Sequence, residues 1–248
     1  MLQYPVHVLL RISLATLLLN MSATTYTVKK NLRKQIRSSL KSLTPQQLSQ
    51  QSALVWDRLF ELPQYKSSEN IGLFLSMPKG EIRTDEACAR VLSEGKTLFV
   101  PRVGLDFEQC DMDLIRVPSK DIRPDLHSVS EDNELFYKDW PRNKWGIPEA
   151  PTSQEYEIAK PGDIDLLIVP GLGFDANGGR LGQGKGYYDR FIQSMRNDGK
   201  GKPLLVAVGL EPSFVKKGIP MMDHDFRMDL VVLPNECYDT MEQNGEEK

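Results

Sequence analysis

Short apolar runs rich in β-branched residues recur along this chain, and their pattern constrains the fold more than any other feature. The runs are Ile71–Leu75, Thr97–Val100, Leu166–Val169, Leu204–Val208 and Leu230–Leu233, with Met112–Val117 as a further strand candidate. Strands that stay apolar at successive positions are typical of parallel sheets, because such sheets are buried on both faces. Helical patterns separate several of the runs. We therefore expect a single three-layer α/β/α domain with a mostly parallel sheet.

Four segments carry a helical pattern: 28–43, 45–60, 84–95 and about 186–195. The first is a basic amphipathic helix, for which a solvated face is the alternative to a functional role. The second has a clear start signal, with Thr44 as N-cap, Pro45 at the first helical position and Gln47 at N3. Thr84 is placed to cap the third helix. Residues 118–160 are expected to form loops and short helical pieces.

Nothing in the composition of the 248 residues marks a linker between two domains. We expect one α/β domain over residues 28–235, after an N-terminal extension (1–27) and before an acidic tail (236–248). A net charge of −3 gives no global basic excess, which argues against a nucleic-acid partner. Three cysteines without paired spacing indicate reduced thiols and argue against a disulfide framework or a zinc site.

The N-terminus differs in composition from the rest of the chain. Residues 1–56 contain no Asp or Glu, and an apolar stretch at 6–19 is interrupted by Arg11. That stretch is too short to indicate a membrane span, so no membrane partner is expected. An acid-poor segment with Ser and Thr resembles a mitochondrial presequence, whereas a start at Met21 would make residues 1–20 upstream translation. A secretory signal is disfavoured by the cysteine usage. These alternatives predict a mitochondrial or a cytoplasmic protein.

The segment 171–190 is chemically the most informative part of the sequence. It contains seven glycines, one lysine, two arginines and two carboxylates directly after Leu166–Val169. Glycines at this density cost chain entropy, so bare backbone must be needed there. The usual need is close approach to a polyanion, whose oxygens accept hydrogen bonds from successive N–H groups beside a helix N-terminus. Phosphate binding is the first hypothesis, and a flexible loop without a ligand is its alternative.

Two known phosphate-binding motifs almost fit this segment and fail at defined positions. Gly179–Lys185 satisfies the first seven positions of the P-loop pattern, but Gly186 stands where Ser or Thr should contact magnesium. Gly171–Ala176 mimics the dinucleotide fingerprint, but the turn residues 177–179 follow where a helix should begin. Neither a Walker site nor a Rossmann site is expected. A metal beside the phosphates would need another ligand, and Asp189 is close by in the sequence.

The strings Pro170–Asp175 and Arg180–Asp189 resemble the signature of the 5-formyltetrahydrofolate cyclo-ligase family, also called methenyltetrahydrofolate synthetases. The likeness extends from about Lys29 to about Leu233. It implies an ATP-dependent enzyme that cyclises 5-formyltetrahydrofolate to 5,10-methenyltetrahydrofolate and releases ADP and phosphate. It also implies Mg²⁺ as the cofactor and ATP and the formyl folate as small-molecule partners, and we expect a monomer.

The resemblance assigns roles at the positions that match the family's motifs. ATP contacts are implied for Lys29, Arg33, Arg180, Gly182, Gly184, Lys185, Gly186, Tyr187 and Tyr188, with Arg180 and Lys185 as the catalytic residues. Folate contacts are implied for Leu75, Glu81, Trp145, Gln183 and Tyr187. Magnesium-associated positions are Asp189 and Asp229. Many family members carry a basic or aromatic residue where Gln183 stands, so the contact at this point is expected to differ. Apart from the resemblance, Glu81 and Asp189 would be ordinary surface acids and Trp145 a core or loop residue.

The expected sheet brings several of these segments together on its own. Ligand sites of open α/β sheets lie outside the carboxyl ends of the strands, where 76–84, the glycine segment and 209–211 all fall. Phosphoryl transfer to the formyl oxygen, followed by attack of the folate N10, needs positioning and charge neutralisation without a protein nucleophile. The competing hypotheses are a non-catalytic nucleotide- or folate-binding module, a nucleic-acid-binding protein that uses the basic helix, and a different enzyme on the same architecture.

Overall fold

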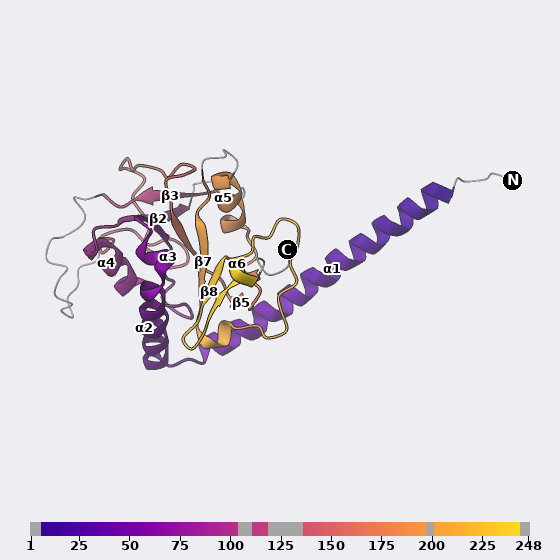
Figure 1. Ribbon diagram of the computed structural model, residues 1–248, viewed down its shortest axis with the longest axis horizontal. Helices are drawn as coiled ribbons and strands as arrows, with labels where there is room; N and C mark the ends of the chain where they lie inside the picture. Colours follow the sequence, from indigo (N-terminus) through magenta and orange to yellow (C-terminus); the bar gives the residue numbers. More distant parts are fainter. Residues whose placement is uncertain (1–5, 104–110, 119–135, 197–200, 244–248) are drawn as a thin grey trace.

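The computed structural model describes residues 6–103, 111–118, 136–196 and 201–243, with side chains between residues 23 and 241 of these ranges. Its central element is a seven-stranded sheet with the order β3-β2-β1-β4-β7-β8-β9 (Figure 1). The strands are β1 (Asn70–Leu73), β2 (Thr97–Val103), β3 (Met112–Arg116), β4 (Leu166–Val169), β7 (Leu204–Val208), β8 (Leu230–Val232) and β9 (Cys237–Asp239). The five inner strands are parallel, whereas β3 and β9 pair antiparallel at the two edges. The predicted α/β fold with a mostly parallel sheet is confirmed.

Helices cover both faces of this sheet. They are α1 (Val6–Lys41), α2 (Pro45–Glu61), α3 (Pro63–Lys66), α4 (Asp85–Ser93), α5 (Tyr187–Arg196) and α6 (Thr240–Gln243). Leu166 and Ile168 of β4 pack in the core that contains the apolar faces of α2 and α4, whereas Leu167 and Val169 pack in the core that contains α5. Because successive strand residues point to opposite faces, β4 must be apolar at all four positions.

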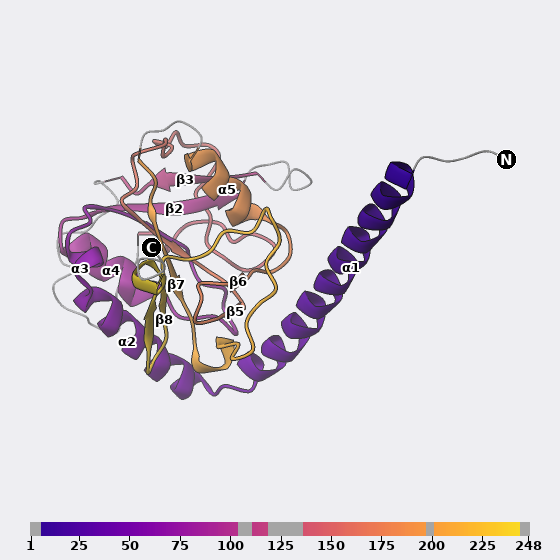
Figure 2. The ribbon, with the colours of Figure 1, turned by 45° about the vertical axis from the view of Figure 1, so that its right-hand side comes forward.

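The helix α1 is longer than the predicted helix 28–43. It begins at Val6 and runs without interruption to Lys41, because neither glycine nor proline occurs between Pro5 and Pro45. Ile36 and Leu40 anchor its C-terminal part in the core. Figures 1 and 2 show the N-terminal part extending away from the rounded body as a long arm.

The predicted start of α2 is confirmed in detail. The Gln47 N–H donates to Thr44 Oγ1 at 3.2 Å, and the Thr44 N–H donates to Gln47 Oε1 at 2.9 Å, which completes a capping box. Thr84 does precede α4, but its side chain does not cap that helix. Its buried hydroxyl instead accepts the Ser76 N–H at 3.0 Å and so closes the loop after β1.

Several short elements differ from the predicted pattern. β5 (Gly173–Phe174) and β6 (Arg180–Leu181) form a separate two-stranded hairpin within the glycine segment, and η2 (Glu211–Ser213) follows β7. β9 lies within residues 236–248, which we expected to form a solvated acidic tail. It belongs to the sheet because Val231 and Val232 of β8 pair with Tyr238 and Cys237.

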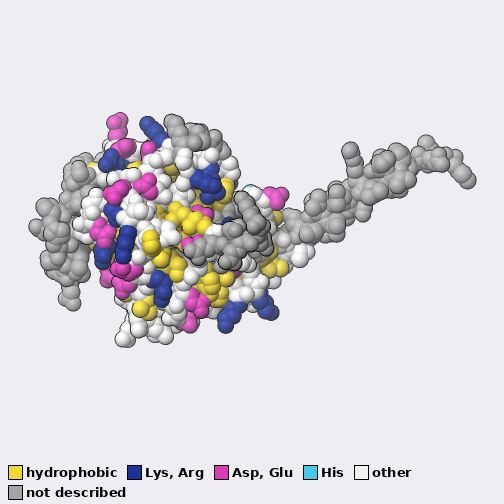
Figure 3. All heavy atoms as spheres, viewed as in Figure 1, with side chains coloured by type: hydrophobic (Ala, Val, Ile, Leu, Met, Phe, Trp, Pro, Cys, Tyr) yellow, Lys and Arg dark blue, Asp and Glu magenta, His cyan; other side chains and the backbone are white. Residues whose placement is uncertain are grey.

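The surface carries charges of both signs. Figure 3 shows Lys and Arg side chains interspersed with Asp and Glu on the viewed face. Within the described residues, no helix is long and apolar enough to cross a membrane. Cys88 is buried and Cys237 is half-buried, and both are free thiols, whereas Cys110 lies outside the described residues.

Candidate active site

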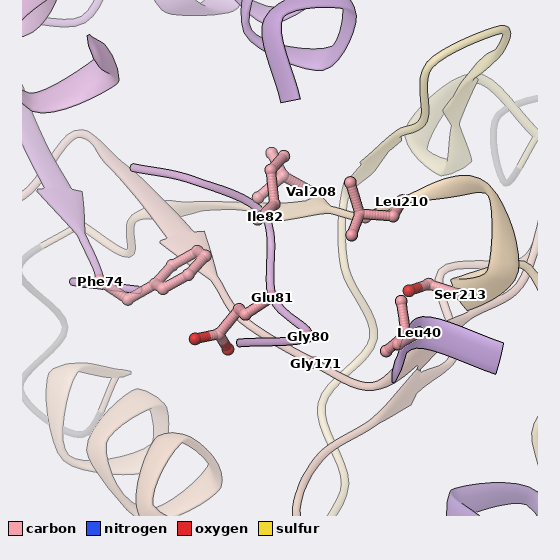
Figure 4. Close-up of a pocket in the computed structure, with 10 residues that line it drawn as sticks. Leu40, Phe74, Gly80, Glu81, Ile82, Gly171, Val208, Leu210 and Ser213 are labelled. Atoms are coloured by element: carbon pink, nitrogen blue, oxygen red, sulfur yellow. The ribbon is translucent and has the colours of Figure 1, made fainter. Parts of the chain in front are cut away.

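The loops that follow β1, β4 and β7 meet at one edge of the sheet, as expected for its carboxyl ends. A small cavity lies between them, and Figure 4 shows its lining from four separate elements: Leu40 of α1, Glu81 after β1, Gly171 after β4, and Val208 with Leu210 at the end of β7. The cavity measures about 10 Å³, which is room for about one water molecule. The cavity is therefore too small to hold an aromatic ring system.

Glu81 is a half-buried acid whose charge is costly in its surroundings. Its Oε2 accepts a hydrogen bond from the Met77 N–H at 2.7 Å. Burial raises the pKa of Glu81 from 4.5 to about 7, and the hydrogen bond from Met77 offsets only part of this rise. Glu81 is thus close to its titration midpoint at neutral pH. A ligand that donates hydrogen bonds to it would favour the charged carboxylate.

Two side chains of α2 hold the main chain next to Glu81. Ser52 Oγ accepts the Arg83 N–H at 3.0 Å, and the Trp56 indole N–H donates to the Arg83 carbonyl. Ser52 and Trp56 are four residues apart and therefore lie on the same face of α2. Together they satisfy both backbone polar groups of Arg83, so the loop that presents Glu81 is tied to a regular helix.

An aromatic pair lies beside this loop. The rings of Trp145 and Tyr187 are 6.3 Å apart at an angle of 86°, an edge-to-face arrangement, and Trp145 is 36% exposed. The residue after Trp145 packs tightly on the loop after β1, since a Cβ on Gly146 would lie 2.9 Å from Pro78 Cγ. The structure thus brings the expected folate residues Glu81, Trp145 and Tyr187 into one neighbourhood.

The seven glycines of the segment 171–190 fall into two groups with different neighbours. A Cβ at Gly171, Gly173, Gly178 or Gly179 would lie 2.3–2.8 Å from other protein atoms. Gly173 and Gly178 let the β5–β6 hairpin pack closely on the rest of the domain, whereas Gly171 and Gly179 allow close packing within the hairpin itself. A Cβ at Gly182, Gly184 or Gly186 would instead face the guanidinium groups of Arg180, Arg33 and Arg190, at 3.0–3.6 Å. Only this second group leaves bare backbone beside cations. A phosphate site would therefore explain three of the seven glycines, and close packing explains the other four.

The C-terminal part of α1 brings two arginines to that backbone. Arg33 Nε donates to the Gly182 carbonyl at 2.9 Å, and Arg37 Nη2 donates to Gln183 Oε1 at 2.7 Å. The pKa of Arg33 is lowered, first by burial and then by the positive charge of Arg37. Two guanidinium groups held this close favour an anion between or beside them.

Lys29, one turn earlier on α1, is already paired in this structure. Its ammonium forms an ion pair with Asp225, and the two side chains are only 7% and 13% exposed. Asp225 Oδ2 also accepts the Met222 N–H at 2.6 Å, and its charge partly counters the lowering of the Arg33 pKa. The expected ATP ligand Lys29 therefore stands at the site with a carboxylate that we did not predict there.

Arg180 is the most deeply buried cation of the glycine segment, with a side chain 5% exposed. Its Nη2 donates to Asp189 Oδ1 at 2.6 Å and its Nη1 donates to the Pro170 carbonyl at 3.2 Å. Arg180 Nε is buried and has no hydrogen-bond partner among the residues that the structure describes. Within the same described residues, Arg58 Nε and Arg196 Nε are unpaired in the same way, so this atom alone does not mark a ligand site. Arg180 differs from them because its guanidinium also lies beside the bare backbone of Gly182.

The remaining polar groups of the segment surround Arg180 and the start of α5. Lys185 is exposed, and its carbonyl accepts a hydrogen bond from Arg190 Nη2 at 2.8 Å. Tyr188 packs against both cores. Burial raises the pKa of the Tyr188 hydroxyl, the charge of Glu81 raises it further, and the charge of Arg180 lowers it. Tyr188 thus lies between the acid after β1 and the buried arginine.

Two predicted residues do not present their side chains at the surface of this arrangement. Leu75 is 3% exposed and belongs to the core. Asp229 precedes β8, and its carboxylate accepts the Leu205 N–H at 2.8 Å at the amino end of β7. The strand register places it three residues below the level of Pro170, which is about 10 Å along the strand direction. The structure does not bring Asp229 to Asp189, because the Asp229 carboxylate closes the start of a strand.

Three residues of the site, Arg37, Asp225 and Arg190, were missed in the sequence. Asp225 was passed over because the carboxylates of 222–229 are alike in type. A signal was present, however, since a residue directly before a parallel strand lies at its amino end, away from the expected site. Arg190 was missed because its role is a backbone contact across one helical turn.

The fold and the site together define an open α/β enzyme that gathers cations around a glycine segment, next to a wall made of an acid and two aromatic rings. A sequence model of the 5-formyltetrahydrofolate cyclo-ligase family matches residues 25–234. The Mus musculus 5-formyltetrahydrofolate cyclo-ligase is 31% identical over 212 residues, which cover 85% of this chain and 96% of the mouse protein. This chain belongs to the 5-formyltetrahydrofolate cyclo-ligase family.

Two further comparisons bear on the fold and on location. The NMR structure of Aquifex aeolicus 5,10-methenyltetrahydrofolate synthetase matches with a TM-score of 0.64 and 27% sequence identity, and it covers 86% of this chain and 93% of that one. An Arabidopsis thaliana protein named "5-formyltetrahydrofolate cyclo-ligase, mitochondrial" is 28% identical over 218 residues, which cover 84% of this chain and 74% of the plant protein.

Proposed function

We propose that the two substrates of this enzyme bind on two surfaces of the site, which we call the ATP wall and the folate wall. Family membership gives this chain 5-formyltetrahydrofolate cyclo-ligase activity. The ATP wall consists of Lys29, Arg33, Arg180, Gly182, Gly184, Lys185, Gly186, Tyr187 and Tyr188. The folate wall consists of Glu81, Trp145 and Tyr187, with Leu75 beneath it and Gln183 at its border with the ATP wall. Arg37 joins the border because it holds Gln183.

The observation that carries the ATP wall is the convergence of three guanidinium groups on bare backbone. Those of Arg180, Arg33 and Arg190 lie 3.0–3.6 Å from where a Cβ would stand on Gly182, Gly184 and Gly186, and a phosphate is an anion that a guanidinium fits well. Asp189 and the Pro170 carbonyl hold two nitrogens of Arg180. The guanidinium therefore keeps its orientation before ATP binds, which lowers the cost of ordering it.

The reaction follows from the weakness of a formamide as an electrophile. Transfer of the γ-phosphoryl group of ATP to the formyl oxygen releases ADP and turns that oxygen into a leaving group. The N10 amine of the folate then attacks the formyl carbon, loses its proton and expels phosphate as the five-membered ring closes. Arg180 and Lys185 neutralise charge on the transferred phosphoryl group, while Glu81 and the Trp145–Tyr187 pair hold the pterin in place.

Two carboxylates stand at the ATP wall, Asp189 paired with Arg180 and Asp225 paired with Lys29. Mg²⁺ commonly takes one or two protein carboxylates together with phosphate oxygens and water. The described part of the chain has no cluster of three or more His, Cys, Asp or Glu that could hold a metal alone. We propose Asp189 and Asp225 as its protein ligands, with Asp225 in the place first expected for Asp229. The ion would supply charge neutralisation to the phosphates.

The assay for this proposal mixes the protein with 5-formyltetrahydrofolate and Mg·ATP and follows the methenyl chromophore and ADP. Replacing Arg180 or Lys185 with alanine is expected to lower kcat/KM for ATP by about 10²–10³-fold, the usual effect of removing one group that stabilises transition-state charge. Lys160→Ala, an exposed lysine before β4, is the matched control and should keep full activity. Undiminished turnover by Arg180→Ala and Lys185→Ala would refute the assigned roles.

A non-catalytic nucleotide- or folate-binding module is the alternative within the same fold. The acids Glu81, Asp189 and Asp225 argue against it, since each is held in a specific contact at the site. Binding of ATP and of 5-formyltetrahydrofolate without any methenyl product would favour the module.

We also propose the organisation of the rest of the chain. Residues 28–235 form the catalytic domain of a monomer, residues 1–27 are an extension and residues 236–248 are the C-terminal end, of which β9 belongs to the sheet. The extension is either a mitochondrial presequence or translation upstream of Met21, with a cytoplasmic protein in the second case. N-terminal sequencing of the native protein distinguishes them, and size-exclusion chromatography with light scattering tests the monomer.

A further inference from the structure

One buried carboxylate of the glycine segment has no place in the chemistry described above. Asp175 follows β5 and is only 3% exposed. Its two oxygens accept three backbone hydrogen bonds, from the N–H groups of Asn177, Gly179 and Ile219. Burying a charged carboxylate costs free energy unless hydrogen bonds compensate it, so these three bonds are needed to hold Asp175 in the interior.

The first oxygen shapes the hairpin that carries Arg180. Asp175 Oδ1 accepts from Asn177 at 2.9 Å and from Gly179 at 2.8 Å. The turn 175–179 leads directly into β6, whose first residue is Arg180. Gly179 is required for this approach, since a Cβ there would lie 2.3 Å from Asp175 Oδ2. The direction in which Arg180 leaves the turn therefore depends on Asp175.

The second oxygen reaches a different part of the chain. Asp175 Oδ2 accepts the Ile219 N–H at 2.6 Å. Three residues further on, the Met222 N–H donates to Asp225, which is paired with Lys29 of α1. Asp175 thus joins the hairpin with Arg180 to the segment that holds Lys29.

We infer that Asp175 is a positioning residue that keeps two parts of the ATP wall, Arg180 and the Lys29–Asp225 pair, in register with each other. The inference rests on the ATP wall of the proposed function and adds how that wall is assembled. Within the described part of the chain, all the hydrogen bonds that Asp175 accepts come from backbone N–H groups. Its effect on ATP is exerted through the cations that it places.

Asp175→Asn is the variant that tests this role. An amide has one acceptor oxygen, and its NH₂ group would face an N–H donor, so the variant keeps either the turn or the link to Ile219 but not both. The fold has an independent tie at this point, the hydrogen bond from the Val215 N–H to the Phe174 carbonyl at 2.8 Å. We expect the KM for ATP to rise at least tenfold while the KM for 5-formyltetrahydrofolate stays within threefold.

Asp165→Asn is the matched control, because Asp165 also accepts backbone N–H groups, from Glu69 and Asn70, but at the amino ends of β1 and β4. It should leave both KM values unchanged. A variant Asp175→Asn with a normal thermal midpoint and an unchanged KM for ATP would overturn the inference. An equal rise in both KM values would also overturn it, because that is the mark of general loosening.

Two further measurements keep the inference separate from the proposed function and from folding failure. If Arg180→Ala raises the KM for ATP and Asp175→Asn does not, the positioning role fails and the ATP wall stands; if neither does, the wall itself is misassigned. Should Asp175→Asn not fold, hydrogen exchange of the wild-type protein decides. A non-hydrolysable ATP analogue should slow exchange in both 173–182 and 214–222, and protection of the first segment alone would contradict the link.

Discussion

Replacing Glu81 with glutamine measures how much free energy of unfolding is lost when this half-buried acid becomes charged. Burial raises the pKa of Glu81 from 4.5 to about 7 in the folded protein, so between these values the folded state holds the proton more tightly than the unfolded state. Its contribution to the free energy of unfolding is therefore complete below about pH 4.5 and is lost as the pH rises through about 7. At about 1.4 kcal/mol per pH unit, the loss amounts to at most about 3 kcal/mol.

Glutamine cannot ionise, so Glu81→Gln should escape this loss. Urea unfolding of both proteins at pH 5 and pH 8 measures it: the free energy of unfolding of the variant, relative to the wild type, should rise by up to about 3 kcal/mol between the two values. Glu86→Gln, an exposed acid on α4, is the control and should show no such change. A difference between Glu81→Gln and wild type that is the same at pH 5 and pH 8 would refute the reasoning. The stabilised variant should nevertheless bind 5-formyltetrahydrofolate more weakly.

Two further substitutions test the supports of the site. Ser52→Ala removes the acceptor of the Arg83 N–H. Because a hydrogen bond contributes about 0.5–1.5 kcal/mol, the KM for 5-formyltetrahydrofolate should rise about 3–10-fold while the KM for ATP stays unchanged. A larger effect on the KM for ATP would contradict this prediction. Gly178→Ala places a Cβ 2.3 Å from the Met228 carbonyl at a φ of +76° and should cost more than about 2 kcal/mol in urea unfolding. Gly80 has a similar φ of +71° with open space around it, so Gly80→Ala should lower the free energy of unfolding by only about 1–2 kcal/mol. Equal losses of stability in the two variants would mean that the contact with Met228 does not add to the cost.

The parts of the fold that the sequence predicted are those determined by neighbouring residues. The apolar run Leu166–Val169 had to be a strand buried on both faces, and the Thr44–Gln47 capping box needed only four residues to mark the start of α2. Thr84 shows the limit of such reasoning. Its position before a helix was correct, but its hydroxyl is used by Ser76, a partner that depends on how the loop after β1 folds back.

The parts of the site that strand order determines were predictable from the sequence. The parts that depend on the direction of a side chain were not. Glu81 and the glycine segment come together because both follow parallel strands. Asp225 and Asp229 lie in one short acidic segment, and composition does not separate them. Asp229 stands directly before a parallel strand and closes its start, whereas the direction of Asp225 toward Lys29 of α1 is known only from their ion pair.

The glycine segment therefore has two tasks that its composition alone does not distinguish. The glycines around Asp175 allow backbone to pack on a buried carboxylate and on the core, which fixes the path of the chain before Arg180. The glycines from Gly182 onward leave backbone open beside guanidinium groups. A phosphate-binding segment needs both, because open backbone binds an anion well only when it is already held in place. Under the proposed function, the N–H donors of this segment should accordingly owe their order to a carboxylate that does not contact the nucleotide.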